Sequence, residues 1–256
     1  MLARRAFLQS LGAATLAPRL GPAPGPRRIL YIAGRFSSSS PAVIRRTVST
    51  LGPSGFNVAI LAFVYARFRG GRLQLTYTGV PFARLYPGLG RALRQLRSGF
   101  PTRKRLLLSL GGWGNAASFA AIRSAGVEGF LQQLDREAVE PLGLEGLDLD
   151  LEPGTAAENT AAGWHAVHDE FGATLVEITN AYRARHPHHI VTHAPIASVA
   201  AGLYARDGGV AGVRGSFFEA TRRPGGGNQI SWLNVQLYEA GDPVSPKAPG
   251  IWKTSA

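Results

Sequence analysis

The sequence predicts an α/β fold of the (β/α)8 barrel type, with about six of its strand-helix units present. Six apolar runs of strand length recur between residues 28 and 239, and each is followed by a segment of helical period or by a glycine-rich loop. Runs that are apolar throughout are typical of strands buried on both faces, which favours parallel pairing with helices outside. The chain has 256 residues, and barrels of this type commonly take about 250 as one domain.

The six predicted strands are RILYIAGRF (28–36), FNVAILAFVYA (56–66), RLLLSLGGW (105–113), GLEGLDLDLE (143–152), HIVTHAPIA (189–197) and WLNVQLYE (232–239). Helical period is clearest after the fourth strand, where Trp164, Phe171 and Ile178 share one stripe of a helix that ends before Pro187. An open, doubly wound sheet is the alternative. The segment after the first strand, GRFSSSSPAV, lacks the glycine spacing of a dinucleotide-binding site, which favours the barrel.

The N-terminal residues are typical of a twin-arginine export signal. Arg4 and Arg5 precede an apolar stretch, Ala6 to Ala17, and a linker rich in proline and glycine. A membrane-spanning helix needs roughly 20 apolar residues, so this stretch is too short to be a stable anchor. We expect residues 1–26 to be signal and linker, residues 27–256 to be one domain, and the protein to be exported to the periplasm or beyond. A basic arm on a cytosolic protein is the alternative.

Composition excludes several kinds of site. The net charge is +12, but the basic residues are scattered, and only Lys104, Lys247 and Lys253 among the 28 are lysines. Such an arginine bias, with many Ala, Gly and Pro residues, reflects coding composition, so we expect no nucleic-acid partner. The absence of cysteine excludes disulfides, thiol nucleophiles and thiolate metal sites.

Three carboxylates alternate with leucines in the fourth strand: Asp148, Asp150 and Glu152. Side chains two apart share one face of a strand, so in a barrel the leucines meet the helices and the acids point inward. Burying them costs several kcal/mol unless they share protons and hydrogen bonds. Glu152 is nearest the C-terminal end of the strand, where barrel active sites are built. The pattern fits carbohydrate hydrolysis, with a solvent-facing strand and a divalent-cation site as alternatives.

The segment EGLDLDLE (145–152) resembles the D-G-x-D-x-D-x-E signature of glycoside hydrolase family 18, with Glu145 in place of the first Asp. This is the chitinase and endo-β-N-acetylglucosaminidase family. Four further segments resemble its A-F, S-x-G-G, M-A-P and Q-x-Y-N elements in the same order, namely AFVY (62–65), SLGGWG (109–114), HAPIA (193–197) and VQLYE (235–239). His193 replaces the Met and Glu239 the Asn. The resemblance covers most of residues 28–240.

The resemblance implies a retaining mechanism in which the substrate supplies its own nucleophile. By position, Glu152 would be the general acid, Asp150 would orient the 2-acetamido group, and Asp148 would share a proton with Asp150. Tyr238 would donate its hydroxyl to the acetamido oxygen. Neither a metal nor a cofactor is expected.

Sugar rings also need apolar surfaces. By position, Trp113, Tyr31 and Phe63 are candidate stacking platforms, although aromatic residues at strand ends are as often part of a core. Gln236 lies on the same face as Tyr238 and is a candidate hydrogen-bond partner for the sugar. His193 is interpreted as a core histidine rather than as the floor of the site.

The expected function is that of a monomeric, exported, chitinase-like hydrolase acting on chitin or related oligosaccharides with β-1,4-linked N-acetylglucosamine. The alternatives are an endo-β-N-acetylglucosaminidase that acts on N-glycans and a non-catalytic carbohydrate-binding barrel. The presence of Glu152 counts against the last.

The C-terminal region is short for a complete barrel. Only 17 residues follow Glu239, whereas two further strand-helix units need roughly 60. Family members place a tryptophan on the eighth strand beneath the reactive sugar, and Trp252 comes too soon after Tyr238 to be that residue. We therefore expect a truncated chain, an open sheet whose first and sixth strands do not pair, a tendency to aggregate through its edges, and weak activity or none.

Overall fold

The computed structural model describes residues 26–237, apart from residues 38–39, 86, 102, 156–158, 206–208, 210–211, 214 and 225–226. Residues 1–25, which make up nearly all of the predicted signal and linker, lie outside this part of the chain. So do Tyr238, Glu239 and Trp252.

Six parallel strands form the body of the sheet. In spatial order they are β1 (Ile29–Ala33), β2 (Val58–Arg69), β5 (Arg105–Gly111), β6 (Gly146–Asp150), β7 (Ile190–His193) and β8 (Trp232–Leu233). Each lies within one of the six predicted runs or, for β2, extends beyond it. Within the described residues no strand pairing joins β1 to β8, so this part of the chain forms an open, barrel-like sheet.

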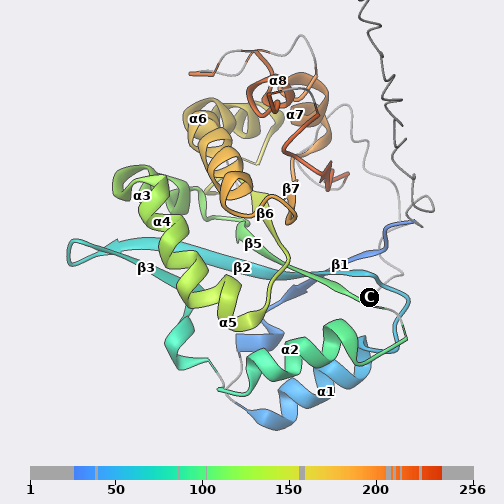
Figure 1. Ribbon diagram of the computed structural model, residues 1–256. Helices are drawn as coiled ribbons and strands as arrows, with labels where there is room; N and C mark the ends of the chain where they lie inside the picture. Colours follow the sequence, from blue (N-terminus) through green and yellow to red (C-terminus); the bar gives the residue numbers. More distant parts are fainter. Residues whose placement is uncertain are drawn as a thin grey trace, which may run out of the picture.

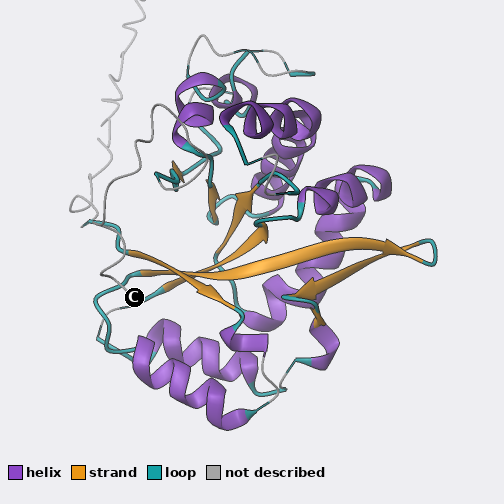
Figure 2. Ribbon diagram, turned by 180° about the vertical axis from the view of Figure 1, so that it is seen from behind, coloured by secondary structure: helices purple, strands orange, loops and turns teal. Residues whose placement is uncertain are grey.

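A β-hairpin on the far half of β2 was not predicted. The strand β3 (Arg72–Tyr77) runs antiparallel to Val64–Arg69, and β4 (Val80–Pro81) pairs with β3. Gly70 and Gly71 make the turn with φ of 55° and 73°, the positive values that a tight two-residue hairpin favours. Figures 1 and 2 show the hairpin projecting well beyond the rest of the sheet.

The helices lie in two groups (Figure 1), and both groups pack on the face of the sheet opposite the carboxylates, where they share one apolar core. In one group α1 (Pro41–Leu51) packs against α2 (Leu89–Ser98), and in the other α3 (Ala116–Ala125) and α4 (Val127–Leu134) pack against α6 (Ala161–Arg185). The remaining helical segments are short: η1 (Arg35–Ser37), η2 (Phe82–Arg84), the π-helical turn η3 (Asp135–Val139), α5 (Glu140–Leu142), α7 (Ala197–Gly202) and α8 (Phe217–Ala220). As predicted, α6 ends before Pro187. In the part of the chain that is described, none of the helices has both the length and the apolar character needed to cross a bilayer.

The two faces of β6 are divided as its alternating pattern predicts. Leu147, Leu149 and Leu151 belong to the large apolar core that the helices cover. A smaller cluster around Val58, Ile60 and Leu107 fills the concave side of the sheet. The carboxylates of Asp148 and Asp150 share that concave side because side chains alternate along a strand.

Candidate active site

Asp148 lies at the centre of the concave side, and its carboxylate accepts four hydrogen bonds. Its Oδ2 accepts from the Tyr31 hydroxyl at 3.0 Å and from Ser109 Oγ at 2.7 Å. Its Oδ1 accepts from Asn234 Nδ2 at 3.0 Å and from Thr192 Oγ1. Burial raises the pKa of Asp148, and these four hydrogen bonds oppose the rise. In all four bonds Asp148 is the acceptor. This arrangement favours the ionised carboxylate, which accepts hydrogen bonds and has no proton to donate.

The next two carboxylates, Asp150 and Glu152, are hydrogen-bonded to each other, and both are buried. Burial, then the charge of Glu152 and then that of Asp148, raise the pKa of Asp150 well above its usual range. Two carboxyl groups hydrogen-bond to each other when one of them is protonated, and the raised pKa of Asp150 favours such a shared proton. Asp150 was expected to share that proton with Asp148, but in this geometry its carboxyl partner is Glu152.

Gln236 fixes the orientation of this pair from the region after β8. Its Nε2 donates to Asp150 Oδ1 at 3.0 Å and to the carbonyl oxygen of Ala194 at 3.0 Å. The backbone supports this position, since the Gln236 N–H donates to the Pro195 carbonyl oxygen at 2.9 Å. The candidate sugar-binding amide is therefore already part of the carboxylate network.

Tyr31 acts as a hydrogen-bond donor in the site. Burial, followed by the negative charges of Asp148 and Asp150, raises its pKa, so the phenol keeps its proton. The ring forms part of the cavity wall, while its hydroxyl is bound to Asp148. The prediction of a stacking platform therefore overlooked the role of the hydroxyl.

The carboxylates face a cavity of about 480 Å³ at the C-terminal ends of the strands. Asp150, Glu152 and Gln236 supply polar groups, while Phe63, Ala62 and Leu233 form part of an apolar wall. A concave site of this size, mostly apolar with a few convergent polar groups, is typical of small-ligand binding. Phe63 thus lies where a sugar ring would find an apolar surface.

Two glycines let the end of β5 approach the site closely. A Cβ on Gly111 would lie 2.0 Å from the Asp150 carbonyl oxygen, and one on Gly112 would lie 2.8 Å from the Phe63 ring. Both glycines also have positive φ, 111° and 83°. The paired glycines of SLGGWG therefore serve a steric purpose, because any side chain would displace Asp150 or Phe63.

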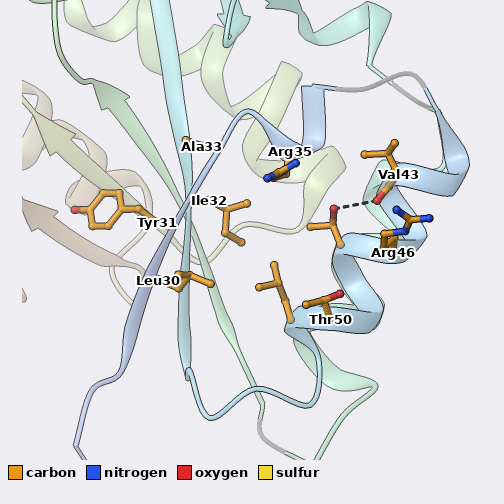
Figure 3. A pocket seen from close by; sticks show the side chains of 10 residues that line it. Leu30, Tyr31, Ile32, Ala33, Arg35, Val43, Arg46 and Thr50 are labelled. Atoms are coloured by element: carbon orange, nitrogen blue, oxygen red, sulfur yellow. Dashed lines mark hydrogen bonds between the residues drawn. The ribbon is translucent and has the colours of Figure 1, made fainter. Parts of the chain in front are cut away.

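A second hollow, of about 500 Å³, lies on the opposite face of β1, next to α1 (Figure 3). In Figure 3 Leu30 and Ile32 point toward α1, whereas Tyr31 points the other way. Its hydroxyl donates to Asp148 on that side. Arg35, Arg46 and Thr50 line this hollow, and none of its lining residues is acidic. Its lining therefore offers no general acid, although its volume is similar to that of the carboxylate cavity.

Two other sequence candidates lie apart from the cavity lining, and a third is outside the described residues. Trp113 follows β5 and is 42% exposed, but it does not line the cavity. Glu145 lies at the N-terminal end of β6, where it accepts from Arg103 at 2.7 Å and from Arg105 at 2.9 Å. Tyr238 is outside the described residues, so its role stays a prediction.

His193 is a core residue, as interpreted from the sequence. Its Nε2 lies 2.9 Å from Thr179 Oγ1, and its Nδ1 lies 2.7 Å from the Tyr204 hydroxyl. Thr179 donates its one hydroxyl proton to the Leu175 carbonyl oxygen, so His193 donates through Nε2 and accepts from Tyr204 at Nδ1. Burial, then the neighbouring His168, lower the pKa of His193 to about 3, which keeps the ring neutral.

Sequence reasoning missed three donors to Asp148: Ser109, Thr192 and Asn234. Ser109 was quoted as part of the S-x-G-G element but was given no role. Thr192 is directly opposite Asp148 in the β6–β7 ladder, and Ser109 is directly opposite it in the β5–β6 ladder. Register alone brings these hydroxyls to one carboxylate, and hydroxyls on strands are too common to signal this in a sequence. Within the described residues, no group of three or more His, Asp and Glu side chains is arranged to hold a metal ion.

Comparison of the chain with known proteins gives matches among solved structures only. No family model matches, and no curated protein matches. A fungal endo-β-N-acetylglucosaminidase from glycosyl hydrolase family 18 superimposes with a TM-score of 0.51 and 21% identity, over 84% of this chain and 68% of that one. The chain has the family 18 fold.

Two other structures with this fold are similar over less of their length. For a family 18 chitinase of Flavobacterium johnsoniae, the TM-score is 0.45 and the identity 16%, over 83% of this chain and 54% of that one. For a family 18 chitinase of Cycas revoluta in complex with (GlcNAc)4, the TM-score is 0.40 and the identity 20%, over 82% of this chain and 54% of that one. The chain thus spans about half the length of these two chitinases.

Proposed function

We propose that the protein is a chitinase-like glycoside hydrolase that cleaves β-1,4-linked N-acetylglucosamine with retention of configuration. The observation that carries the proposal is the buried carboxyl pair of Asp150 and Glu152, which lines a cavity at the C-terminal ends of the strands. A buried carboxyl group that keeps its proton near neutral pH is what a general acid requires. The family 18 fold and the resemblance of residues 145–152 to the family signature support the same conclusion.

In the first step Glu152 donates its proton to the glycosidic oxygen, and the bond between that oxygen and the anomeric carbon breaks. The carbonyl oxygen of the substrate's own 2-acetamido group forms the new bond to the anomeric carbon, giving an oxazolinium intermediate. Asp150 accepts a hydrogen bond from the acetamido N–H and balances the positive charge that develops there. The burial that raises the pKa of Asp150 also strengthens this electrostatic interaction.

In the second step Glu152, now ionised, takes a proton from water as the water oxygen attacks the anomeric carbon. The oxazolinium ring opens and Glu152 returns to its protonated form. Two inversions at one carbon restore the original configuration. Asp148, which accepts from four donors, is held in place beneath Asp150 throughout. The predicted donation from Tyr238 to the acetamido oxygen belongs to this proposal as well.

A second candidate is hydrolysis of the chitobiose core of N-glycans. It is favoured by the neighbour that superimposes with a TM-score above 0.5, which is an endo-β-N-acetylglucosaminidase. The two activities use the same carboxylates and differ in the glycan that the surrounding loops accept. A non-catalytic binding barrel is the third alternative, and the retained Asp150–Glu152 pair argues against it.

The discriminating experiment is to incubate the full chain with chitin oligosaccharides and, separately, with a high-mannose glycopeptide. Products are separated by mass, and Glu152→Gln serves as the matched control. Cleavage of the oligosaccharides alone supports the chitinase, and release of the glycan alone supports the second candidate. Binding of either substrate by the wild type without turnover would instead identify a binding barrel.

We also propose that the protein is exported through its N-terminal signal and acts as a monomer. The support is Arg4 and Arg5 before the short apolar stretch. Replacing both arginines by lysine should retain a fused reporter in the cytoplasm if the twin-arginine route is used. Size-exclusion chromatography with light scattering tests the monomer, and a dimer mass would contradict it.

A further inference from the structure

Charge is divided very unevenly along the chain. Residues 1–127 contain no Asp or Glu at all, so all 16 acidic residues lie from Glu128 onward. The same first half carries 19 of the 28 lysines and arginines. Every arginine of the β2–β3 hairpin therefore belongs to a stretch of sequence that provides no carboxylate for it.

Three of these arginines share one face of the hairpin. In the ladder Arg69 is opposite Arg72, Arg67 is opposite Gln74, and Tyr65 is opposite Thr76. Side chains directly opposite each other in a ladder point to the same side, with Cβ atoms about 5 Å apart. By register these residues share one face of the hairpin, and we call them the hairpin row (Tyr65, Arg67, Arg69 and Arg72). Arg72 also borders a hollow next to α4 that Glu137 lines.

The hairpin row continues the face that lines the active-site cavity. The register between β2 and β5 shifts between Ala62 and Val64, so Phe63 is an extra residue there. Beyond the shift, Val64 and Ala66 belong to the core under the helices, while the odd-numbered side chains face the other way. Phe63 lines the cavity, so the row starts there and runs to the turn, over about 20 Å at roughly 3.3 Å per residue.

The arginines of the hairpin row have no anionic partner within the described residues. All three are exposed, and none forms an ion pair or side-chain hydrogen bond there. In contrast, Arg103 and Arg105 share the carboxylate of Glu145. Two like charges directly opposite each other, such as Arg69 and Arg72, destabilise a hairpin. An anionic ligand along the row would remove that repulsion.

We propose that the hairpin row binds an anionic glycan that extends out of the cavity, a chain of N-acetylated sugars carrying carboxylate groups. The inference rests on the proposed function, because the cavity would hold the N-acetylglucosamine unit and the row the acidic part of the same chain. Guanidinium groups bind carboxylates through paired hydrogen bonds, and Tyr65 offers a ring face next to the cavity. Neutral chitin would leave the three charges without a partner.

The test uses the full chain with Glu152→Gln, so that ligands are bound without turnover, and isothermal titration calorimetry at low salt. The probes are chitotetraose, a tetrasaccharide of alternating β-1,4-linked N-acetylglucosamine and N-acetylmuramic acid, and the methyl ester of that tetrasaccharide. We expect the acidic tetrasaccharide to bind about tenfold more tightly than the other two, because its two carboxylates would form two exposed charge pairs with the row. Raising the salt concentration should reduce the difference.

Replacing Arg67, Arg69 and Arg72 together by glutamine should abolish the preference and leave chitotetraose binding unchanged. The matched control replaces three exposed arginines of α1 and α2, Arg45, Arg91 and Arg94, and should retain the preference. Equal binding of the three probes, or a preference that survives the hairpin variant, would overturn this inference alone. Absence of both chitotetraose binding and wild-type hydrolysis would overturn the proposed function with it, as would binding of a single-stranded oligonucleotide to the row in place of any glycan.

Discussion

The hydroxyl of Thr192 offers a direct test of how the protein tolerates a buried charge. Of the four donors to Asp148, Thr192 does most to counter the rise in pKa that burial causes. Both side chains are 0% exposed, so water cannot replace the bond. Thr192→Val keeps the shape and removes the donor. A hydrogen bond to a charged group contributes about 1.5 to 3 kcal/mol, so we expect a loss of about 2 kcal/mol in the free energy of unfolding at pH 7.

The loss should depend on pH in a defined direction. The folded-state pKa of Asp148 is raised, so its contribution to stability is fully present below the unfolded pKa of about 3.9 and is lost as pH rises through the folded pKa. Removing the Thr192 hydroxyl raises the folded-state pKa of Asp148 further. The variant should therefore lose more stability than the wild type as the pH rises. Near pH 3.5 Asp148 is largely protonated in both the folded and the unfolded state. The difference in free energy of unfolding between the variant and the wild type should then fall to less than half of its value at pH 7.

Urea unfolding of both proteins at pH 7 and pH 3.5, followed by tryptophan fluorescence, measures these differences. Thr192→Ser keeps the hydroxyl and is the matched control. Its free energy of unfolding at pH 7 should fall much less than that of Thr192→Val. An equal loss at the two pH values would refute the reasoning, because it would show that packing rather than the charge on Asp148 sets the cost.

Three further outcomes are expected. Glu152→Gln should lower hydrolysis of chitin oligosaccharides at least about a hundredfold and leave their binding nearly intact, because the amide keeps the shape but cannot donate the proton; more than about one per cent residual activity would contradict the role of Glu152. Activity should survive treatment with a chelator and should be inhibited by a thiazoline analogue of the intermediate, whereas activity lost to the chelator and restored by Mg²⁺ would favour a cation site. Gly111→Ala should destabilise the fold and lower activity, because its Cβ would lie 2.0 Å from the Asp150 carbonyl oxygen, whereas Gly129→Ala, which meets nothing within 4 Å, should have little effect; equal melting temperatures for the two variants would refute this.

The sequence was most informative where one face of a strand differs from the other. The alternation of leucines and acids in β6 predicted correctly which side chains meet the helices, because the period of a strand is fixed by its geometry. The other five strands were also predicted, since each begins in a largely apolar run. The hairpin was missed although Gly70–Gly71 marks its turn, because the apolar run was interpreted as a strand that ends at Ala66.

The contacts that complete the site were not predictable in the same way. Ser109, Thr192 and Asn234 reach Asp148 from β5, β7 and the segment after β8, so their convergence depends on the registers between strands. The proton partner of Asp150 is likewise set by side-chain orientation, which strand periodicity does not determine. Position in a motif suggested stacking platforms at Phe63 and Trp113. Phe63 lines the cavity and Trp113 does not, and stacking of a sugar on either ring stays a prediction.

The four donors to Asp148 also bear on the order of events during folding. The bond from Tyr31 closes a loop of 117 residues, and the bond from Asn234 closes one of 86 in the other direction. Contacts so distant in sequence form slowly, because the entropy of closing the intervening chain is lost before any contact forms. During synthesis Asp148 emerges from the ribosome after Tyr31 but long before Asn234. The aspartate at the centre of the site is therefore among the last groups to acquire its full set of partners, and a newly made chain acquires its catalytic geometry only when β8 docks.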